Sequence, residues 1–327
     1  MSHPRSRSLF ALAWALCAAA LAPQALAQAG YPERPVKVIV ALPAGGCADM
    51  IARMVTQKMA ADLGQPFVVD NKAGASGQIG TPLVAKAAPD GYTLMVSPAS
   101  FLTTNKSIFK TLPYDPQADF VPITKLVNQP MVLVVKDTQK FPDVAAVLAG
   151  ARAAPGRLTY ASSGDGSPQH LAALMFSTRT GARMLHVPYK GGAPAINDTL
   201  SGQVDMLFAV LPEALPHIQS GKLHPVALMG PKRSPLLPGV PTMAESGVAQ
   251  VELSAWVGLL APAGTPQPIL DKLQRAAHAA LAGDTATRLA ANGMEVAPGT
   301  GEQLKDSIAQ EIRVHSELVK AAGLTPQ

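Results

Sequence analysis

Two loops rich in small and polar residues give this sequence its clearest capacity to bind a ligand. The first, Pro43–Asp49, reads P-A-G-G-C-A-D and lies between the β-branched run Val36–Val40 and a stretch with helical spacing. The second, Ser162–Pro168, reads S-S-G-D-G-S-P and also precedes a helical stretch. Because a helix N-terminus exposes unpaired N–H groups and partial positive charge, each loop suits an anionic ligand. The same residue types also build plain turns and caps, so a purely structural role is the alternative for both loops.

Other residues in or near these loops could have either a structural or a functional role. His170 falls in the first turn after the second loop, where a structural role is favoured over ligand binding. Asp205 begins a strand, which slightly favours a turn or cap over a ligand contact. Cys47 is expected to fill space rather than to react, because free cysteine behaves as a small apolar residue. Asp49 is expected to be the N-cap that shapes its loop.

These residues must be positioned by alternating strands and helices. Strands are predicted at 36–40, 67–69, 92–96 and 131–135, and again at 158–161, 184–187, 204–208, 224–229 and 253–261. Helical stretches lie between most of them, and the longest helices are predicted at 266–281 and 301–321. The pattern predicts an α/β fold with a mainly parallel sheet, arranged as two lobes. Ligands of such sheets bind beyond the carboxyl ends of the strands, where the loops described above fall.

The N-terminus has the pattern of a secretory signal peptide. Arg5 and Arg7 precede the apolar run Leu9–Leu21, and Ala25-Leu26-Ala27 offers small residues at the cleavage positions. We therefore expect residues 1–27 to be removed after Ala27 and the protein to be exported to the periplasm. A membrane anchor is the alternative, but the apolar run is short for one.

Removing the signal peptide changes the composition of the 327-residue chain. Two arginines and no acids are lost, so the formal charge falls from +5 to +3, too mild to indicate a nucleic-acid partner. Cys17 is lost as well, and Cys47 alone allows no intramolecular disulfide. Trp256 becomes the only tryptophan.

Catalytic and cofactor motifs are absent from the sequence. There is no G-x-S-x-G elbow and no Walker A loop, and Gln169 stands where a dinucleotide fingerprint would need its third glycine. The histidines show no metal-ligand spacing. We expect no enzyme activity, no cofactor and no metal. An exported serine hydrolase that uses Ser163 or Ser167 with His170 is the competing interpretation.

The whole mature chain resembles the periplasmic substrate-binding proteins of tripartite tricarboxylate transporters, the Bug family of extracytoplasmic solute receptors. The segments that carry the resemblance occur in one order along the chain: Tyr31–Pro35, Pro43–Gly46 with Asp49, Ile51–Arg53, Leu63–Pro66, Ala85–Leu94, Leu112–Pro116, Tyr160–Gly164, Gly166-Ser167, His170-Leu171, His186–Gly191, Gly202–Asp205, Lys232–Pro235, Gly239–Thr242 and Ala261–Pro266.

This resemblance implies a two-lobed, type II periplasmic-binding fold that closes on a small carboxylate. Residues 28–130 and 252–327 would form lobe I, and residues 131–251 would form lobe II. Hinges are expected near residues 128–131 and 246–256. The protein would act as a monomeric receptor that serves a two-component membrane permease or a sensor. The effector half of a transcription regulator shares this fold type, but it would lack a signal peptide and would carry a DNA-binding domain.

The resemblance also places the ligand site. The expected site residues come from the two loops and from the walls of the cleft between the lobes: Pro43, Ala44, Gly45, Gly46, Cys47, Ala48, Asp49, Ser97, Ser100, Ser162, Ser163, Gly164, Gly166, Ser167, Gln169, His170, Tyr189, Asp205 and Ala209.

Four departures from the family pattern lower the polarity of the expected cleft. They are Cys47-Ala48 in place of Gly/Pro-Thr, Leu174 in place of Glu, Ala209-Val210 in place of Asp-Asn, and Val257 in place of an aromatic residue after Trp256. The ligand is therefore expected to carry an apolar or aromatic part beside its carboxylate.

Overall fold

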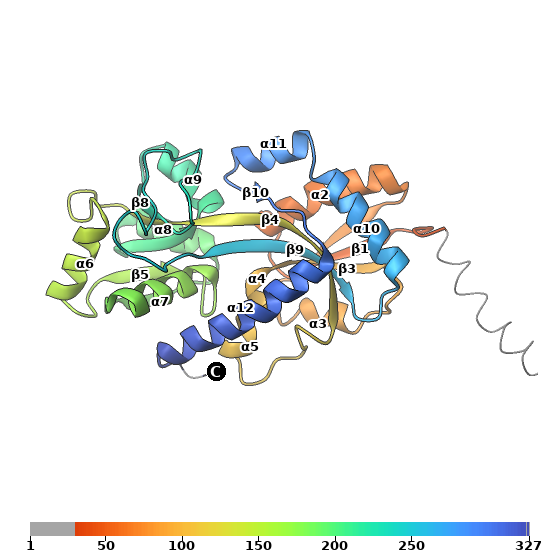
Figure 1. Ribbon diagram of the computed structural model, residues 1–327, viewed down its shortest axis with the longest axis horizontal. Coiled ribbons are helices and arrows are strands. Elements are labelled where there is room, and N and C mark those ends of the chain that lie inside the picture. The colour runs from red at the N-terminus through yellow and green to blue at the C-terminus, as the bar shows by residue number, and fades with distance from the viewer. Residues whose placement is uncertain (1–29, 325, 327) are drawn as a thin grey trace, which may run out of the picture.

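The computed structural model describes residues 30–324 and residue 326. The predicted signal peptide, residues 1–27, lies outside the described residues. Two twisted sheets lie end to end with helices around them, and the long strand β4 (Phe120–Val135) runs through both (Figure 1). Within the described range, no helix is long and apolar enough to cross a membrane. The predicted α/β class is confirmed.

The first sheet combines parallel and antiparallel strands. Strand β1 (Val36–Val40) pairs in parallel with β2 (Phe67–Asn71) and β3 (Thr93–Pro98). Strand β9 (Ser254–Pro262) then pairs antiparallel with both β3 and the first part of β4. The short β10 (Glu295–Val296) completes the sheet on the other edge of β4.

The second sheet begins where the first one ends on β4. Residues Met131–Val135 of β4 pair antiparallel with β7 (Met206–Val210), and β8 (His224–Leu228) pairs with the other edge. Strand β5 (Thr159–Ser162) continues in parallel from β7, and β6 (Leu185–Pro188) follows. The sequence had predicted a mainly parallel sheet. Because β4 and β9 pair antiparallel with their neighbours, both sheets are instead mixed.

The strand directions decide which loops can meet. Strand β4 is antiparallel to β9, which is antiparallel to β3, so β1, β3 and β4 all point toward the second sheet. Strands β5, β6 and β7 run the opposite way and point back toward the first sheet. The carboxyl ends of both sets of strands therefore face each other, and both loops at which the sequence predicts ligand binding follow such ends.

Helices cover both faces of each sheet (Figure 1). Around the first sheet lie α2 (Cys47–Leu63), η1 (Ala75–Gly77), α3 (Thr81–Ala85), α4 (Ala99–Leu102), α5 (Asn105–Ile108), α10 (Gln267–Ala280), α11 (Asp284–Ala291) and α12 (Gly301–Ala321). Around the second lie α6 (Val144–Ala153), α7 (Pro168–Thr180), α8 (Gly192–Ser201) and α9 (Leu211–Gln219).

Helices α2 and α10 pack together on one face of the first sheet, and α12 packs on the other. In the second sheet, α6 and α7 cover one face, and α8 and α9 cover the other. These apolar contacts fix where each helix begins relative to its strand.

Strand β4 is much longer than the predicted strand at 131–135. Pro122 and Pro130 interrupt the apolar pattern, which favours a shorter strand. The register of β4 against β9 shifts between Pro122 and Thr124, so the proline falls at a bulge where its missing N–H is tolerated. Pro130 lies at the point where pairing passes from β9 to β7.

Helix α12 also joins the two parts of the molecule. Its first half packs on β4 and Trp256, while Leu318 and Val319 near its end lie in an apolar cluster with Leu171 of α7. Trp256 of β9 is only 2% exposed, and its indole N–H donates to both carboxylate oxygens of Glu311 on α12, at 2.8 and 3.0 Å. Burial raises the pKa of Glu311 to about 6, although the Trp256 bond opposes this change.

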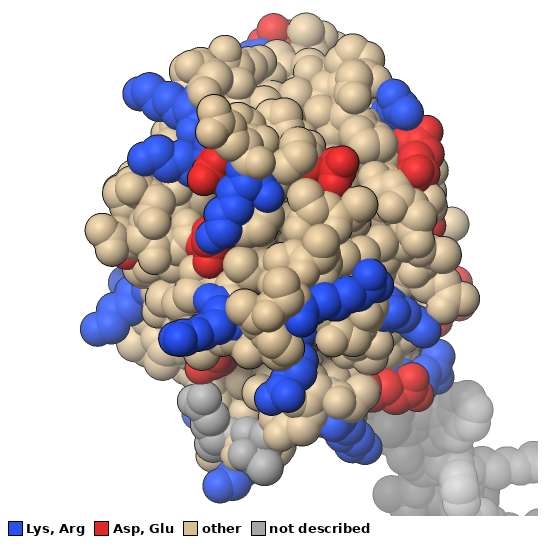
Figure 2. Space-filling view, turned by 90° about the vertical axis from the view of Figure 1, so that its left-hand side faces the viewer, with Lys and Arg blue, Asp and Glu red and all other residues tan. Residues whose placement is uncertain are grey.

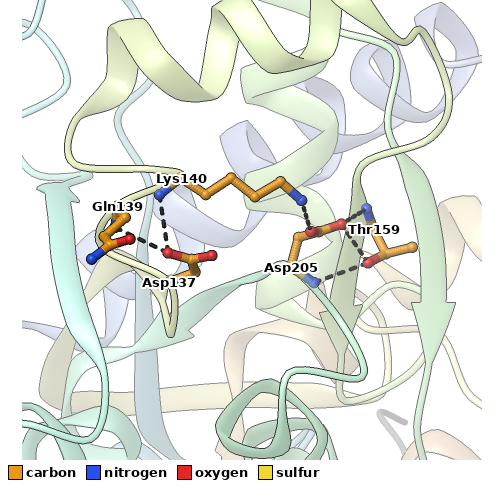
Figure 3. Close-up of polar contacts among 5 residues, drawn as sticks. All are labelled: Asp137, Gln139, Lys140, Thr159 and Asp205. Carbon is orange, nitrogen blue, oxygen red and sulfur yellow. Dashed lines mark hydrogen bonds and ion pairs between the residues drawn. The ribbon is translucent and has the colours of Figure 1, made fainter.

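Asp205 holds together three segments at the amino ends of the strands (Figure 3). Its Oδ2 accepts hydrogen bonds from the backbone N–H and the hydroxyl of Thr159, both at 2.9 Å, and its own N–H donates to that hydroxyl. Its Oδ1 accepts from Lys140 Nζ at 2.8 Å. Burial opposes ionisation, but these hydrogen bonds outweigh it and lower the pKa of the carboxyl group.

Figure 2 shows the end of the molecule formed by the second sheet. Lysine and arginine side chains are spread over this face, with neutral surface and acidic side chains between them. The modest positive charge of the sequence is therefore not gathered into one basic patch on this face.

We predict that Asp205→Asn lowers the free energy of unfolding at pH 7 by about 1–3 kcal/mol, because it removes hydrogen bonds to a charged group. The lowered pKa makes this contribution present above the unfolded pKa near 4 and lost as pH falls through the folded pKa. Lys140→Met removes only the half-exposed ion pair and should cost less than about 1 kcal/mol. Urea denaturation at pH 7 and pH 3 measures both effects, and equal losses in the two variants would contradict this assignment.

We also predict that Trp256 emission titrates with Glu311 in the mature chain. Because the pKa of Glu311 is raised, its contribution to stability is present below the unfolded pKa near 4.3 and is lost as pH rises through about 6. Emission should change with a midpoint near 6, and Glu311→Gln should abolish the change. Glu317→Gln alters an exposed glutamate of the same helix and should leave the titration intact. A midpoint that survives in Glu311→Gln would rule out Glu311 as the titrating group.

Candidate functional site

The loop between β1 and α2 is closed by Asp49. Its Oδ2 accepts hydrogen bonds from the Gly45 N–H at 2.9 Å and from Arg53 Nε at 3.0 Å. The helix begins at Cys47 with Gly46 as N-cap, so the prediction that Asp49 is itself the N-cap was wrong by three positions. Burial opposes ionisation, yet these hydrogen bonds lower the pKa of the Asp49 carboxyl group. The side chain is only 4% exposed, and its hydrogen bonds shape the loop.

The loop between β5 and α7 is held by its own hydroxyl groups. Ser167 is the N-cap of α7, because its Oγ accepts a hydrogen bond from the His170 N–H. Ser163 Oγ donates to Gln169 Oε1 at 2.8 Å. Gly164 and Gly166 have φ angles of +121° and +71°, which favour glycine. The loop is thus pre-formed around the start of α7.

Two histidines, the buried His170 and the partly buried His186, support this loop from beneath. The rings of His170 and His186 are stacked with centroids 4.0 Å apart, and Tyr160 stacks on His186 at 4.9 Å. The Gly166 N–H donates to Nδ1 of His170 at 3.2 Å, and Ser162 Oγ lies 2.6 Å from Nε2 of His186. Burial lowers the pKa of both rings, that of His170 to about 4, so both are neutral at pH 7. His170 thus lies beneath the loop and accepts a hydrogen bond from one of its backbone N–H groups.

Asp165, His170 and His186 place three possible metal ligands within 4.8 Å of one another. The two rings are nearly parallel, with an interplanar angle of 16°, so their in-plane lone pairs cannot converge on one ion. His170 Nδ1 already accepts a hydrogen bond from Gly166. The trio fits a support for the loop better than a metal centre.

The hydrolase arrangement that the sequence left open is not formed. Ser163 and Ser167 direct their hydroxyls to Gln169 and to the backbone of His170, not to the His170 ring. A different serine, Ser162, does contact a histidine ring, and Nδ1 of that ring lies 3.6 Å from Asp165. Ser162 is fully buried, however, and its Oγ also accepts from the Gly164 N–H, so a substrate carbonyl has no access to it.

The remaining predicted residues lie in several environments. Ser97 and Ser100 are buried at the carboxyl end of β3 and the start of α4. Tyr189 follows β6 and donates its hydroxyl to Asp198 Oδ2 at 2.6 Å. Ala209 is fully buried in the apolar cluster beneath α8 and α9. Asp205 lies at the opposite end of β7 from the loops, so the structure does not bring it to the site.

The two sheets approach each other at the facing loops. A side-chain atom added at Gly166 would lie 3.0 Å from Ile108 Cγ1 and 3.3 Å from Thr104 Cγ2, which belong to the other part of the molecule. Cys47 likewise lies near Glu213. Burial raises the pKa of the Cys47 thiol to about 12, and the charge of Glu213 adds to this effect. The thiol therefore stays protonated at neutral pH, as expected of a space-filling residue.

Glu213 is a residue that the sequence analysis missed. It lies in the first turn of α9, directly after β7, and accepts a 3.4 Å hydrogen bond from Gln169 Nε2. A signal was available, since Glu213 is the only Asp, Glu, Lys or Arg between Asp205 and Lys222. Cys47, Gln169, Gly192 and Glu213 each belong to the first turn of their helix.

A hollow of about 290 Å³ lies beside the facing loops, under α12. It is lined by α4, α7, the start of β9 and α12, and Ser100 is the only predicted site residue in its wall. The backbone donors of the two ligand loops are not part of it. The hollow therefore adjoins the candidate site without forming it.

Solved structures of related proteins share this arrangement. R. palustris Rpa4515, solved with adipate, is 34% identical, with a TM-score of 0.85 over 91% of this chain and 100% of that chain. The periplasmic binding protein BugD is 37% identical, with a TM-score of 0.81 over 91% and 100%. MatC from Rhodopseudomonas palustris, solved with malate, is 32% identical, with a TM-score of 0.80 over 88% and 100%.

A family model also matches most of the chain. The model described as "Tripartite tricarboxylate transporter family receptor" covers residues 51–324, which include every described strand except β1 and all of α2 after its first turn. The match agrees with the resemblance seen in the sequence motifs. The chain belongs to the receptor family of the tripartite tricarboxylate transporters.

Proposed function

We propose that this protein is a periplasmic receptor that captures a small carboxylate and delivers it to a two-component membrane permease of the tripartite tricarboxylate type. The observation that carries this proposal is the meeting of helix starts from both sheets at the facing loops. Helix N-termini supply backbone donors and positive potential, which favour a carboxylate without needing a basic side chain. Relatives solved with adipate and with malate support the same ligand class.

We further propose that the ligand is held by those backbone N–H groups of the loops at 43–48 and 162–167 that do not already donate within the protein, with the hydroxyls of Ser163 and Ser167 nearby. Both hydroxyls already have partners within the protein, so water would bridge some of the contacts. The low polarity of Cys47, Ala48 and the surrounding loops supports a ligand that carries an apolar or aromatic part beside its carboxylate.

The lobes proposed for this receptor follow the division of hydrogen bonds on β4. Residues Phe120–Pro130 pair with β9, and Met131–Val135 pair with β7. This supports lobe I at 28–130 with 252–327 and lobe II at 131–251. The chain returns to lobe I at Leu253–Ser254, where the Leu253 N–H still donates to Met229 of the second sheet. Hinge movement would occur at these two crossings, and the end of α12 would slide on α7.

The proposal also includes export of the protein and cleavage of its signal peptide. Residues 1–27 would direct export and be cleaved after Ala27, and the mature protein would act as a monomer. A permease is the expected partner, and a membrane sensor could use the same closed form.

We predict that a side chain at Gly166 prevents closure. Gly166→Leu places its side chain against Thr104 and Ile108 of the opposite lobe, so affinity for a bound carboxylate should fall roughly tenfold or more, or about 1.4 kcal/mol. Gly181→Leu is the matched control, because Gly181 has nearly the same φ of +70° but open space around it. Both variants should lose similar stability, while only Gly166→Leu should lose affinity.

The measurement is thermal-shift screening followed by calorimetry, with adipate, malate and aromatic monocarboxylates as probes. The protein should first be unfolded and refolded to remove retained ligand, since a bound ligand raises the melting temperature. Stabilisation by at least one carboxylate is expected. A protein that no carboxylate stabilises would overturn the proposed function, and equal affinity losses in the two glycine variants would overturn closure at Gly166.

A further inference from the structure

Glu213 places a carboxylate at the point where four helices begin. Gln169, the second residue of α7, donates to Oε2 at 3.4 Å. A methyl group on Gly192, the first residue of α8, would lie 2.5 Å from the same oxygen, so the carboxylate rests directly against that backbone. Cys47, the first residue of α2, faces it from the other lobe, close enough for the charge of Glu213 to affect the thiol. An acidic group thus occupies the centre of a site built for anions.

Apart from the positive potential of the helix starts around it, this carboxylate has little compensation among the described residues. In the part of the chain that the structure describes, Glu213 takes part in no ion pair, and its one side-chain hydrogen bond is the long contact with Gln169. Burial raises its pKa to about 7, while the Gln169 bond lowers it slightly. Glu213 is only partly exposed to solvent, so its charge is costly unless a partner of opposite charge is supplied.

A ligand that carries only carboxylates would add electrostatic repulsion to the uncompensated charge of Glu213. Its negative charge would lie among the same helix starts as Glu213, and like charges at such short range repel each other. A ligand with a protonated amine beside its carboxylate would place the amine between the two anions. It would supply Glu213 with a charge-assisted hydrogen bond, which is among the strongest polar contacts in proteins.

We infer that Glu213 is a specificity-determining residue that accepts a hydrogen bond from a protonated amino group on the ligand, which rests on the receptor function proposed above. The preferred ligand class is then amino-carboxylates rather than plain mono- or dicarboxylates. The helix starts of α2 and α7 bind the ligand carboxylate, and Glu213 binds the ligand amine.

The test compares acids that share one carbon skeleton. Succinate, malate and aspartate differ at C2 in carrying hydrogen, hydroxyl or a protonated amine, and adipate and 2-aminoadipate form a longer pair. Calorimetry on the refolded full receptor at pH 8 should show the amino member of a set binding at least roughly tenfold more tightly than its unsubstituted partner.

Glu213→Gln keeps the shape of the side chain and removes the charge. It should weaken binding of the amino member roughly tenfold or more and should leave the unsubstituted acid unchanged or more tightly bound. Glu213→Met should change the two affinities in the same way as Glu213→Gln. Melting temperatures report whether each variant is folded. Glu295→Gln removes one exposed charge of lobe I and should change neither affinity.

The outcomes separate this inference from the receptor function. If unsubstituted acids bind at least as tightly as their amino partners and Glu213→Gln affects both alike, Glu213 does not recognise a ligand amine. That result overturns only the inference about Glu213. If no acid in either form binds the wild-type protein, the carboxylate-receptor function falls with it. The relative affinities of the wild-type protein for amino and unsubstituted acids are sufficient to test the inference about Glu213, even if a variant fails to fold.

Discussion

The continuous strand β4 is the constraint on which the rest of this structure depends. Its first part pairs with β9 and its last five residues pair with β7, so one strand fixes the directions of all the others. Strands of the first sheet that run parallel to it must end toward the second sheet, and the antiparallel partners in the second sheet must end toward the first. Every strand-to-helix loop that can bind a ligand is thereby turned inward. The shared strand also leaves few covalent connections between the sheets, which suits hinge motion.

Electrostatics at this meeting point depend on helix starts rather than on basic side chains. The loop hydroxyls and Asp49 are used to shape the backbone, and neutral stacked histidines support it from below. Such a site can hold an anion through N–H groups and helix dipoles, because little reorganisation is needed when the ligand arrives. Asp49 is paired with Arg53, whereas Glu213 forms no ion pair among the described residues. Its position among the helix starts gives the site a way to distinguish between carboxylates that the loops alone would treat alike.

Sequence reasoning predicted most of the elements, since β-branched runs, glycine-rich loops and C-terminal glycines mark them clearly. Gly64, for example, ends α2 in the left-handed conformation that favours glycine. The length of β4 could not be predicted, because Pro122 is tolerated only at a bulge that tertiary pairing creates. The two candidate loops follow strand ends, as predicted, whereas Asp205 was assigned to the cleft wall although it lies at the opposite end of its strand. The proximity of Glu213 to Cys47 depends on the approach of two distant segments, which no local pattern encodes.

The most direct test of this account is a crystal structure of the refolded protein with a bound carboxylate. The account predicts that the carboxylate lies between the loops at 43–48 and 162–167, within hydrogen-bond distance of their backbone N–H groups, with no Lys or Arg side chain in contact. A carboxylate bound instead in the hollow under α12, or held by a basic side chain, would contradict it.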